Sequence, residues 1–353
     1  MFMNEKSALE EFLDLHDEKT WAAMIKGLLT DIHEVDRNAT QIWFRFFPLE
    51  LFRVLETVED KSDLIRKFDM QGNYELAGQI DSSHKFLYGH RYWKEVKEEI
   101  ASQAEKVALT EQDLANMIKQ IAHAVAEKNG APETLLIGIT AAGLMTLVQS
   151  GLEKFKAAPG RVNIDSQHLK KSPEKILAER AKDDSQGFFG FLKTVDKKWT
   201  VTYDENVNNA KFKAVDSEEI ATAAARDQSQ NWLEKDARCI EGVIPVECRS
   251  AACGTCWVGV LGGAEKLSEV ARREEKSMKR FGYLYSEEAR PLIRLACQAQ
   301  TNGAVSIVIP PWNGVFGKHL YKDNVSEEVL EPATTSAKAT RTVVKEATKN
   351  QLL

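Results

Sequence analysis

The chain has 353 residues, of which 43% are hydrophobic, a fraction typical of globular proteins with a real core. Its formal charge of −6 leaves no basic excess, which argues against nucleic acid as a partner. Five cysteines are too few for a disulfide scaffold, and the segment from Met1 to Ser7 does not resemble a secretory signal. An odd number of cysteines without a signal indicates a reducing compartment, so we expect a cytoplasmic protein.

Residues 1–158 predict an all-α domain of unknown role. Apolar side chains from Leu114 to Val125 fall on one helical face, and Asn129-Gly130 is expected to end that helix. A segment rich in aromatic residues, from Ile42 to Leu55, should be kinked or split by Pro48. We expect these aromatic side chains in a core, with an interface as the alternative.

Residues 134–152 contain no charged side chain and are nearly long enough to cross a membrane. The same segment contains three threonines, three glycines, Gln149 and Ser150, which a membrane span does not favour. We therefore predict the buried central helix of a helical domain, with membrane contact as the alternative.

The histidines of this region invite a metal interpretation. His33 lies among Asp31, Glu34 and Asp36, and His84 and His90 could in principle ligate a haem. A di-iron site in a helix core, however, needs a Glu three residues before a His, and none of the seven histidines has one. We interpret these histidines as surface or core residues.

Residues 159–197 predict a linker with one short helix, which Ser172-Pro173-Glu174 should begin. Within it, the segment from Phe188 to Leu192 is expected either to be exposed for docking or to pack on the helical domain. Residues 323–353 are rich in Ala, Thr, Lys and Glu and predict a disordered tail.

From Trp199 the pattern changes from helices to strands. The expected elements, in chain order, are a hairpin of Trp199–Tyr203 and Lys211–Val215, a helix after Ser217, a strand at Cys256–Leu261, a charged helix at about Ser268–Phe281, and two strands, Ile293–Gln300 and Val305–Ile309, paired across Asn302-Gly303.

Four cysteines indicate the chemistry of this region. Cys248, Cys253 and Cys256 form C-x4-C-x2-C, and Cys297 lies far downstream, which is the ligand spacing of plant-type [2Fe–2S] centres. A zinc site normally pairs two C-x2-C units, and only one is present. A thioredoxin-like dithiol would leave Cys248 and Cys297 unexplained. We interpret Cys239 as a buried apolar residue rather than a ligand.

The segment from Ile244 to Cys256, IPVECRSAACGTC, resembles the cluster loop of plant-type [2Fe–2S] ferredoxins. The order of elements between Lys198 and Trp312 is also similar to that family. The resemblance implies a β-grasp domain over residues 198–322, and hence an α+β chain with its all-α domain first. It implies a metal-binding, iron–sulfur site with Cys248, Cys253, Cys256 and Cys297 as ligands, while Arg249 and the amides of residues 250–255 tune the charge of the cluster.

Three features depart from the family pattern. Ala251 stands where the family usually has Gly, so the loop must tolerate a Cβ atom there. The stretch between Asp216 and Ile244 is longer than the single helix of the family, and the separation of Cys256 from Cys297 is also long. Because such insertions are common in the loops of modular ferredoxins, they bear on which partner the domain binds more than on whether it binds a cluster.

The resemblance implies one-electron transfer, in which the helical domain docks a redox partner such as a reductase or oxidoreductase. The chain has no G-x-G-x-x-G motif after a strand and no P-loop, so it resembles an electron carrier more than a self-contained enzyme. The charged helix mixes both signs between Arg272 and Arg280, which favours a dedicated or tethered partner. The alternatives are an electron-feeding subunit or enzyme with its own active site in the helical domain, and a redox-sensing interaction protein.

Overall fold

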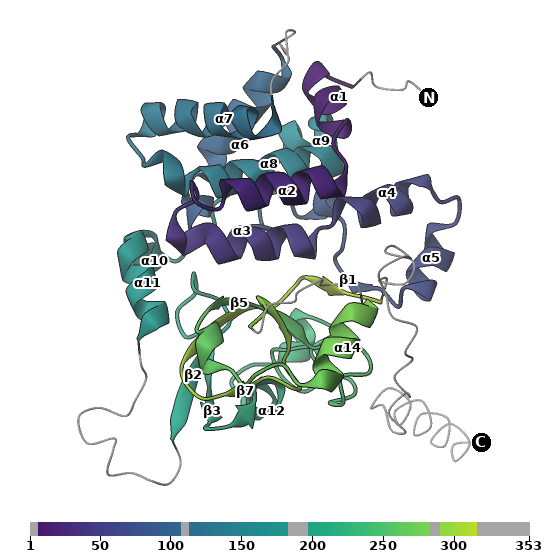
Figure 1. Cartoon of the computed structure of the whole chain (residues 1–353), viewed down its shortest axis with the longest axis vertical. Coiled ribbons are helices and arrows are strands. Elements are labelled where there is room, and N and C mark those ends of the chain that lie inside the picture. The colour runs from purple at the N-terminus through teal and green to yellow at the C-terminus, as the bar shows by residue number, and fades with distance from the viewer. Residues whose placement is uncertain (1–5, 107–112, 183–196, 282–289, 316–353) are drawn as a thin grey trace. The chain divides into compact units, whose positions relative to one another are not determined.

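The computed structural model describes residues 6–106, 113–182, 197–281 and 290–315 (Figure 1). Its N-terminal region is helical and its C-terminal region contains a mixed sheet, which confirms the α+β class. The chain forms two compact units that are not contiguous in sequence. The first comprises residues 1–61, 73–179 and 204–209, and the second comprises residues 62–72, 180–203 and 210–353. The domain limits expected from the sequence stay a prediction.

The first unit is a helical bundle. Its helices are α1 (Ala8–Asp14), α2 (Glu18–Leu28), α3 (Glu34–Phe46), α4 (Leu49–Thr57), α6 (Trp93–Ala104), α7 (Leu114–Asn129), α8 (Ile137–Ser150), α9 (Leu152–Ala157), α10 (Ser166–Leu169) and α11 (Pro173–Ala181), the last of which continues into the second unit. Short 3-10 turns lie at η1 (Leu76–Gly78), η2 (Tyr88–Tyr92) and η3 (Glu133–Leu135).

Helix α8 lies at the centre of this bundle. It contacts α1, α3, α4, α6, α7 and α9, and all of its 14 residues except Val148 are buried. A helix with no charged residue and with apolar side chains around most of its surface is stable when it is buried in a protein core. The predicted buried central helix is therefore confirmed. In the part of the chain that the structure describes, no helix is long and apolar enough to cross a membrane.

Local sequence signals account for several helix ends. Pro48 separates α3 from α4, as expected, and the aromatic side chains of Trp43, Phe46 and Phe47 are buried in the core. Helix α7 ends at Gly130, whose φ of +62° is the left-handed conformation that glycine adopts without steric cost. Helix α11 begins at Pro173, as predicted.

The histidines of the helical unit serve local structure. His33 caps α3, because its Nδ1 accepts a hydrogen bond from the Val35 amide at 3.2 Å. His84 and His90 are fully buried, and their Nδ1 atoms lie 3.1 Å apart. Nearby, Trp93 stacks at a tilt on His84, with ring centroids 4.0 Å apart. The pair is thus part of the core, as the sequence interpretation allowed.

The second unit is built on a five-stranded sheet. Its strands are β2 (Lys198–Thr202), β3 (Lys211–Val215), β5 (Trp257–Gly262), β6 (Ile293–Leu295) and β8 (Val305–Val308), in the order β3-β2-β8-β5-β6. The pair β2 and β8 is parallel and the other pairs are antiparallel. Two helices, α12 (Ile220–Arg226) and α14 (Arg272–Phe281), contact strands β3 and β6 respectively. A short helix, α13 (Trp232–Lys235), follows α12, and β4 (Glu218–Glu219) pairs with β7 (Gln300–Thr301).

The predicted hairpin across Asn302-Gly303 is wrong. The strand β8 pairs with β2 and β5, while β6 pairs with β5. The reason is a turn after Leu295, whose carbonyl oxygen accepts from the amides of Gln298 at 2.8 Å and Ala299 at 2.9 Å. This turn interrupts the expected strand and presents Cys297.

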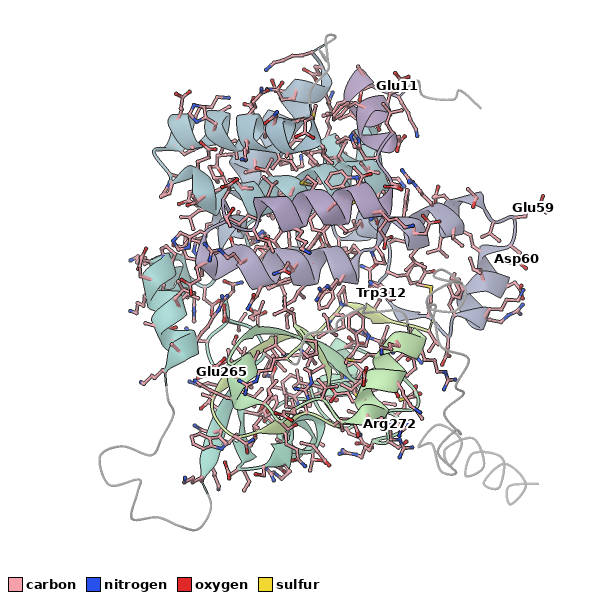
Figure 2. All side chains as sticks on the ribbon, viewed as in Figure 1. Glu11, Glu59, Asp60, Glu265, Arg272 and Trp312 are labelled. Carbon is pink, nitrogen blue, oxygen red and sulfur yellow. The ribbon has the colours of Figure 1, made fainter. Side chains whose placement is uncertain are left out.

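A segment from the N-terminal half belongs to the second unit. Residues 62–72, called the strap below, comprise most of α5 (Lys61–Lys67) and the strand β1 (Gln71–Gly72). Strand β1 pairs antiparallel with β9 (Trp312–Asn313), and Trp312 is labelled in Figure 2. The expectations for Phe188–Leu192 and for the tail at 323–353 lie outside the described residues.

Candidate functional site

The loop from Cys248 to Cys256 precedes strand β5 and has an unusual backbone. Arg249, Ala251 and Gly254 have φ values of +53°, +59° and +71°. Left-handed residues placed between extended or right-handed ones turn successive amides toward one side. Accordingly, the amides of Ser250 and Ala252 donate to Cys248 Sγ at 3.4 and 3.3 Å. The loop thus surrounds its first thiol with N–H groups.

The four cysteines predicted as ligands come together, two and two. The Cys248 thiol is hydrogen-bonded to Cys253, and the Cys256 thiol to Cys297. The two pairs are also close enough to interact electrostatically. Charge on Cys253 raises the pKa of Cys256, and charge on Cys248 raises the pKa of Cys297. No three His, Cys, Asp or Glu side chains among the described residues surround a position for one metal ion.

Hydrogen bonding within each pair lowers the pKa of one thiol and raises the pKa of the other. Hydrogen bonding from Cys253 lowers the pKa of Cys248 to about 4, with burial opposing and the amides of Ser250 and Ala252 assisting. The same bond, with burial, raises the pKa of Cys253. In the second pair the hydrogen bond raises the pKa of Cys256 and lowers that of Cys297. Thiolates are the metal-binding form of cysteine, so the lowered pKa values of Cys248 and Cys297 favour metal binding.

Buried donors around the thiols fit an iron–sulfur cluster. The hydroxyl of Ser250 is buried and has no hydrogen-bond partner of ordinary length. Thr255 Oγ1 lies 3.2 Å from Cys253 Sγ, and Gln298 Nε2 lies 3.4 Å from Cys297 Sγ. The amide of Ala251 helps to lower the pKa of Cys297. Four thiols in two pairs, with amide and hydroxyl groups close to their sulfur atoms, fit the donor set of a two-iron cluster.

Two small residues let the loop pack closely. A Cβ atom on Gly254 would lie 3.0 Å from ring carbons of Phe281, the last residue of α14. Ala251 is 1% exposed and already carries a Cβ atom at a left-handed φ, where other L-residues cost about 1–2 kcal/mol. Glycine, the residue that the family usually has here, adopts this left-handed conformation without steric cost, whereas the Cβ atom of Ala251 makes it strained.

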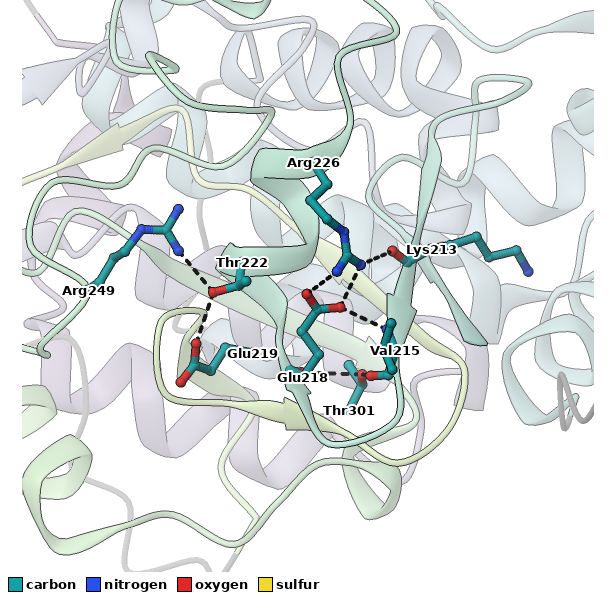
Figure 3. Close-up of polar contacts among 8 residues, drawn as sticks. All are labelled: Lys213, Val215, Glu218, Glu219, Thr222, Arg226, Arg249 and Thr301. Atoms are coloured by element: carbon teal, nitrogen blue, oxygen red, sulfur yellow. Dashed lines mark hydrogen bonds and ion pairs between the residues drawn. The ribbon is translucent and has the colours of Figure 1, made fainter. Parts of the chain in front are cut away.

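Arg249 anchors the loop to helix α12 (Figure 3). Its Nη1 donates to Thr222 Oγ1 at 2.9 Å, and its Nη2 to Glu241 Oε2 at 2.6 Å. Thr222 in turn donates to Glu219 Oε2 at 2.9 Å. Figure 3 also shows Glu218 bound to Arg226 at the end of the same helix. These bonds hold the side chain of Arg249 to α12, while its tuning of cluster charge stays a prediction.

The charged helix α14 is only partly available for docking. Arg272, labelled in Figure 2, and Arg273 are exposed, but Glu274 is fully buried. Its carboxylate accepts from Arg294 Nε and Nη2, both at 2.9 Å, and from the Leu295 amide at 2.9 Å. The sequence interpretation treated Glu274 as one of the helix's surface charges, and that is wrong, because it forms an interior ion pair.

Cys239 is buried, as expected, and its thiol lies 3.1 Å from the Val243 carbonyl oxygen, with burial raising its pKa to about 12. Gln71 Nε2 donates to Glu247 Oε1 at 3.1 Å, and Glu247 is the residue before Cys248. Sequence reasoning missed Gln298 and Gln71. Gln298 could have been found beside Cys297, whereas Gln71 is 176 residues away from Glu247 and carried no signal.

The comparison with protein families agrees with this geometry. Residues 209–301 match the family described as the 2Fe-2S iron-sulfur cluster binding domain. The match includes all four paired cysteines and does not extend to the N-terminal region. No curated protein and no solved structure matches the chain. The C-terminal half therefore carries a 2Fe–2S cluster binding domain, and its cofactor is a [2Fe–2S] cluster.

Proposed function

We propose that the protein is a one-electron carrier whose [2Fe–2S] cluster is held by Cys248, Cys253, Cys256 and Cys297. The observation that carries this proposal is the meeting of the four thiols in two pairs, inside the matched domain. Once bound, such a cluster supplies one-electron transfer, at a potential of roughly −400 mV for plant-type centres. The chain's own residues orient the thiols, donate N–H groups to sulfur and exclude water.

The sheet order supports a β-grasp assignment for this domain. The first two strands, β2 and β3, form a hairpin, and the last strand of the five, β8, lies parallel to β2 in the middle of the sheet. Such an arrangement carries the cluster loop into β5 and leaves Cys297 beyond the end of β6, the neighbour of β5. The fold thereby joins three ligands from one loop to a fourth from a distant turn.

Burial differs between the two thiol pairs. Cys256 and Cys297 are 2% and 3% exposed, whereas Cys248 and Cys253 are partly exposed. Because electron transfer weakens with distance, a partner would approach the side of Cys248 and Cys253. We propose that this side is where electrons enter and leave.

The helical unit is proposed to dock a dedicated redox partner, a reductase or an oxidoreductase. One feature supports a protein-binding role: Leu15 is 82% exposed and Leu169 is 48% exposed, both on this unit. We propose Leu15 and Leu169 as contact residues for this partner. A reducing compartment such as the cytoplasm remains part of the proposal, supported by five cysteines that are all free.

Metal analysis of the anaerobically purified full chain tests the cluster directly. We expect about two irons per chain, equal sulfide and a ferredoxin-like visible spectrum. Cys297→Ser should lose this spectrum, whereas Cys239→Ser, a matched change at a buried thiol outside the pairs, should keep it. Zinc without iron in fresh protein would contradict the proposal. Extra iron or a haem band would instead favour the alternative of an enzyme or subunit with a second redox centre.

A further inference from the structure

We propose that the strap, residues 62–72, is a working part of the cluster-binding unit, and that Gln71 is a positioning residue for Glu247 beside the first ligand. This inference rests on the proposed function, since it concerns the behaviour of the bound cluster. It assigns a role to a segment of the N-terminal half that the family match leaves out.

The strap is joined to the helical unit at both ends. The chain leaves that unit after Lys61 and re-enters it at Asn73, so the strap is an excursion from the helical sequence into the second unit. An excursion that merely crossed a surface would be expected to bury few side chains. Phe68 is instead 1% exposed and Met70 is 8% exposed.

Backbone contacts fix the strap to the end of the cluster domain. In addition to the pairing of β1 with β9, the amide of Val315 donates to the Phe68 carbonyl oxygen at 2.5 Å. Gly72 has a φ of +84°, and a Cβ atom there would lie 2.4 Å from the Pro311 carbonyl oxygen. The strand therefore sits so close to the chain before β9 that only glycine fits.

From this position the strap contacts the start of the cluster loop directly and is linked to its end through Trp312. At the start of the loop, Gln71 donates to the carboxylate of Glu247, the residue before Cys248. At the end of the loop, Trp257 follows Cys256 and meets Trp312 edge-on, with ring centroids 6.2 Å apart. Trp312 is the residue of β9 that pairs with Gly72.

The bond from Gln71 has an electrostatic consequence. Glu247 places a carboxylate directly before a ligand of the cluster, and adding an electron beside a negative charge is unfavourable. The side-chain amide of Gln71 donates a hydrogen bond to this carboxylate, so its partial positive charge lies against the carboxylate and fixes its position. Without this donor, we expect the carboxylate to be less compensated and the reduction potential to fall.

A double-mutant cycle in the full-length protein tests this pairing. Gln71→Met keeps the length of the side chain but removes the donor, and Glu247→Met removes the charge. We expect Gln71→Met to lower the midpoint potential and to release iron to a chelator about tenfold faster, the effect of losing one hydrogen bond to a charged group. Glu247→Met should raise the potential, and adding Gln71→Met to it should change the potential no further.

Control variants separate this effect from general destabilisation. Gln41→Met removes a partly exposed glutamine whose Nε2 donates to the Arg37 carbonyl oxygen within α3, and should behave as the wild type. Gly72→Ala should release iron faster, because it displaces the strap. Gly130→Ala has similar left-handed strain but meets nothing within 4 Å, and should retain iron normally.

Two results would overturn the proposal. One is a Gln71→Met protein with a wild-type midpoint potential and wild-type iron release. The other is an equal shift by Gln71→Met with and without Glu247, which would show that the effect does not pass through that carboxylate. Both outcomes differ from failure of the proposed function, in which the wild-type protein itself would lack a [2Fe–2S] spectrum.

Discussion

Glu274 and Arg294 form an ion pair in the interior of the second unit, with side chains 0% and 2% exposed. Arg294 also donates to the Ser268 carbonyl oxygen at 2.8 Å, so the pair links α14, β6 and the residues before the helix. A buried pair of this kind leaves an uncompensated charge when one partner is removed.

Glu274→Ala is therefore expected to destabilise the protein by about 3–5 kcal/mol, as for other broken buried pairs. Urea unfolding followed by tryptophan fluorescence measures this loss. The matched control is Glu275→Ala, the next residue, whose carboxylate pairs with Lys279 at the surface and should have little effect. Equal effects of the two substitutions would show that burial of the first pair has no energetic importance.

Ala251→Gly should stabilise the protein, because it relieves a left-handed residue of its Cβ atom. The expected gain is at most about 1 kcal/mol, since the relief of about 1–2 kcal/mol of strain is offset by about 0.4–1 kcal/mol for the added flexibility of the unfolded chain. Thermal unfolding of the iron-loaded protein provides the measurement. Ala252→Gly, one residue further along and not left-handed, should destabilise it. A lower midpoint for Ala251→Gly would contradict the strain argument.

The buried pair of His84 and His90 predicts a loss of stability in acid. Burial lowers the pKa of His90 to about 4 and that of His84 well below its usual 6.5. For His90, the charges of Arg91 and Lys85 add to this lowering, while Asp81 and Asp204 oppose it. Because the unfolded chain binds these protons more readily, the contribution is complete above pH 6.5 and is lost as pH falls toward 4.

The loss attributable to His90 should reach about 3 kcal/mol over this range. His90→Gln should flatten the dependence of unfolding free energy on pH between 6.5 and 4, as followed by circular dichroism. His123→Gln is the control, because hydrogen bonding to Glu133 raises the pKa of that exposed histidine, so its contribution has the opposite sign. An unchanged slope in His90→Gln would contradict the assignment.

Gly254→Ala should weaken cluster binding through steric contact. The added methyl group would meet ring carbons of Phe281 at 3.0 Å, and the φ of +71° already disfavours a side chain. We expect iron to be lost about tenfold faster, from a combined strain of roughly 1–2 kcal/mol. Iron release to a chelator measures this, and Gly254→Ala with Phe281→Leu should recover part of the loss. A wild-type rate for the single variant would show that the loop relaxes freely.

Signals that act over a few residues were predictable from sequence. The spacing of the cysteines, the break at Pro48 and the stop at Gly130 each depend on backbone chemistry close to the residue concerned. The uncharged segment of α8 was interpretable because its threonines and glycines suit a crowded protein interior.

Features set by distant pairing were not predictable. The residues on either side of Glu274, Arg273 and Glu275, are both charged, so the local sequence does not mark it as buried. Only the ion pair with Arg294 makes it an interior residue. The turn after Leu295 replaced an expected hairpin, and β8 instead lies between β2 and β5 and pairs with both, which local sequence does not indicate. The strap shows the same limitation, since Gln71 and Glu247 meet only once the strand β1 has paired with β9.

The most direct test of the central claim is an anaerobic reductive titration of the full-length protein, monitored by visible absorption and electron paramagnetic resonance. Our account predicts that one electron per chain reduces the [2Fe–2S] cluster and produces one unpaired spin, that Cys239→Ser behaves alike, and that Cys297→Ser loses the signal. A protein that binds the cluster but takes up no electron, or one in which Cys297→Ser titrates like the wild type, would contradict the account.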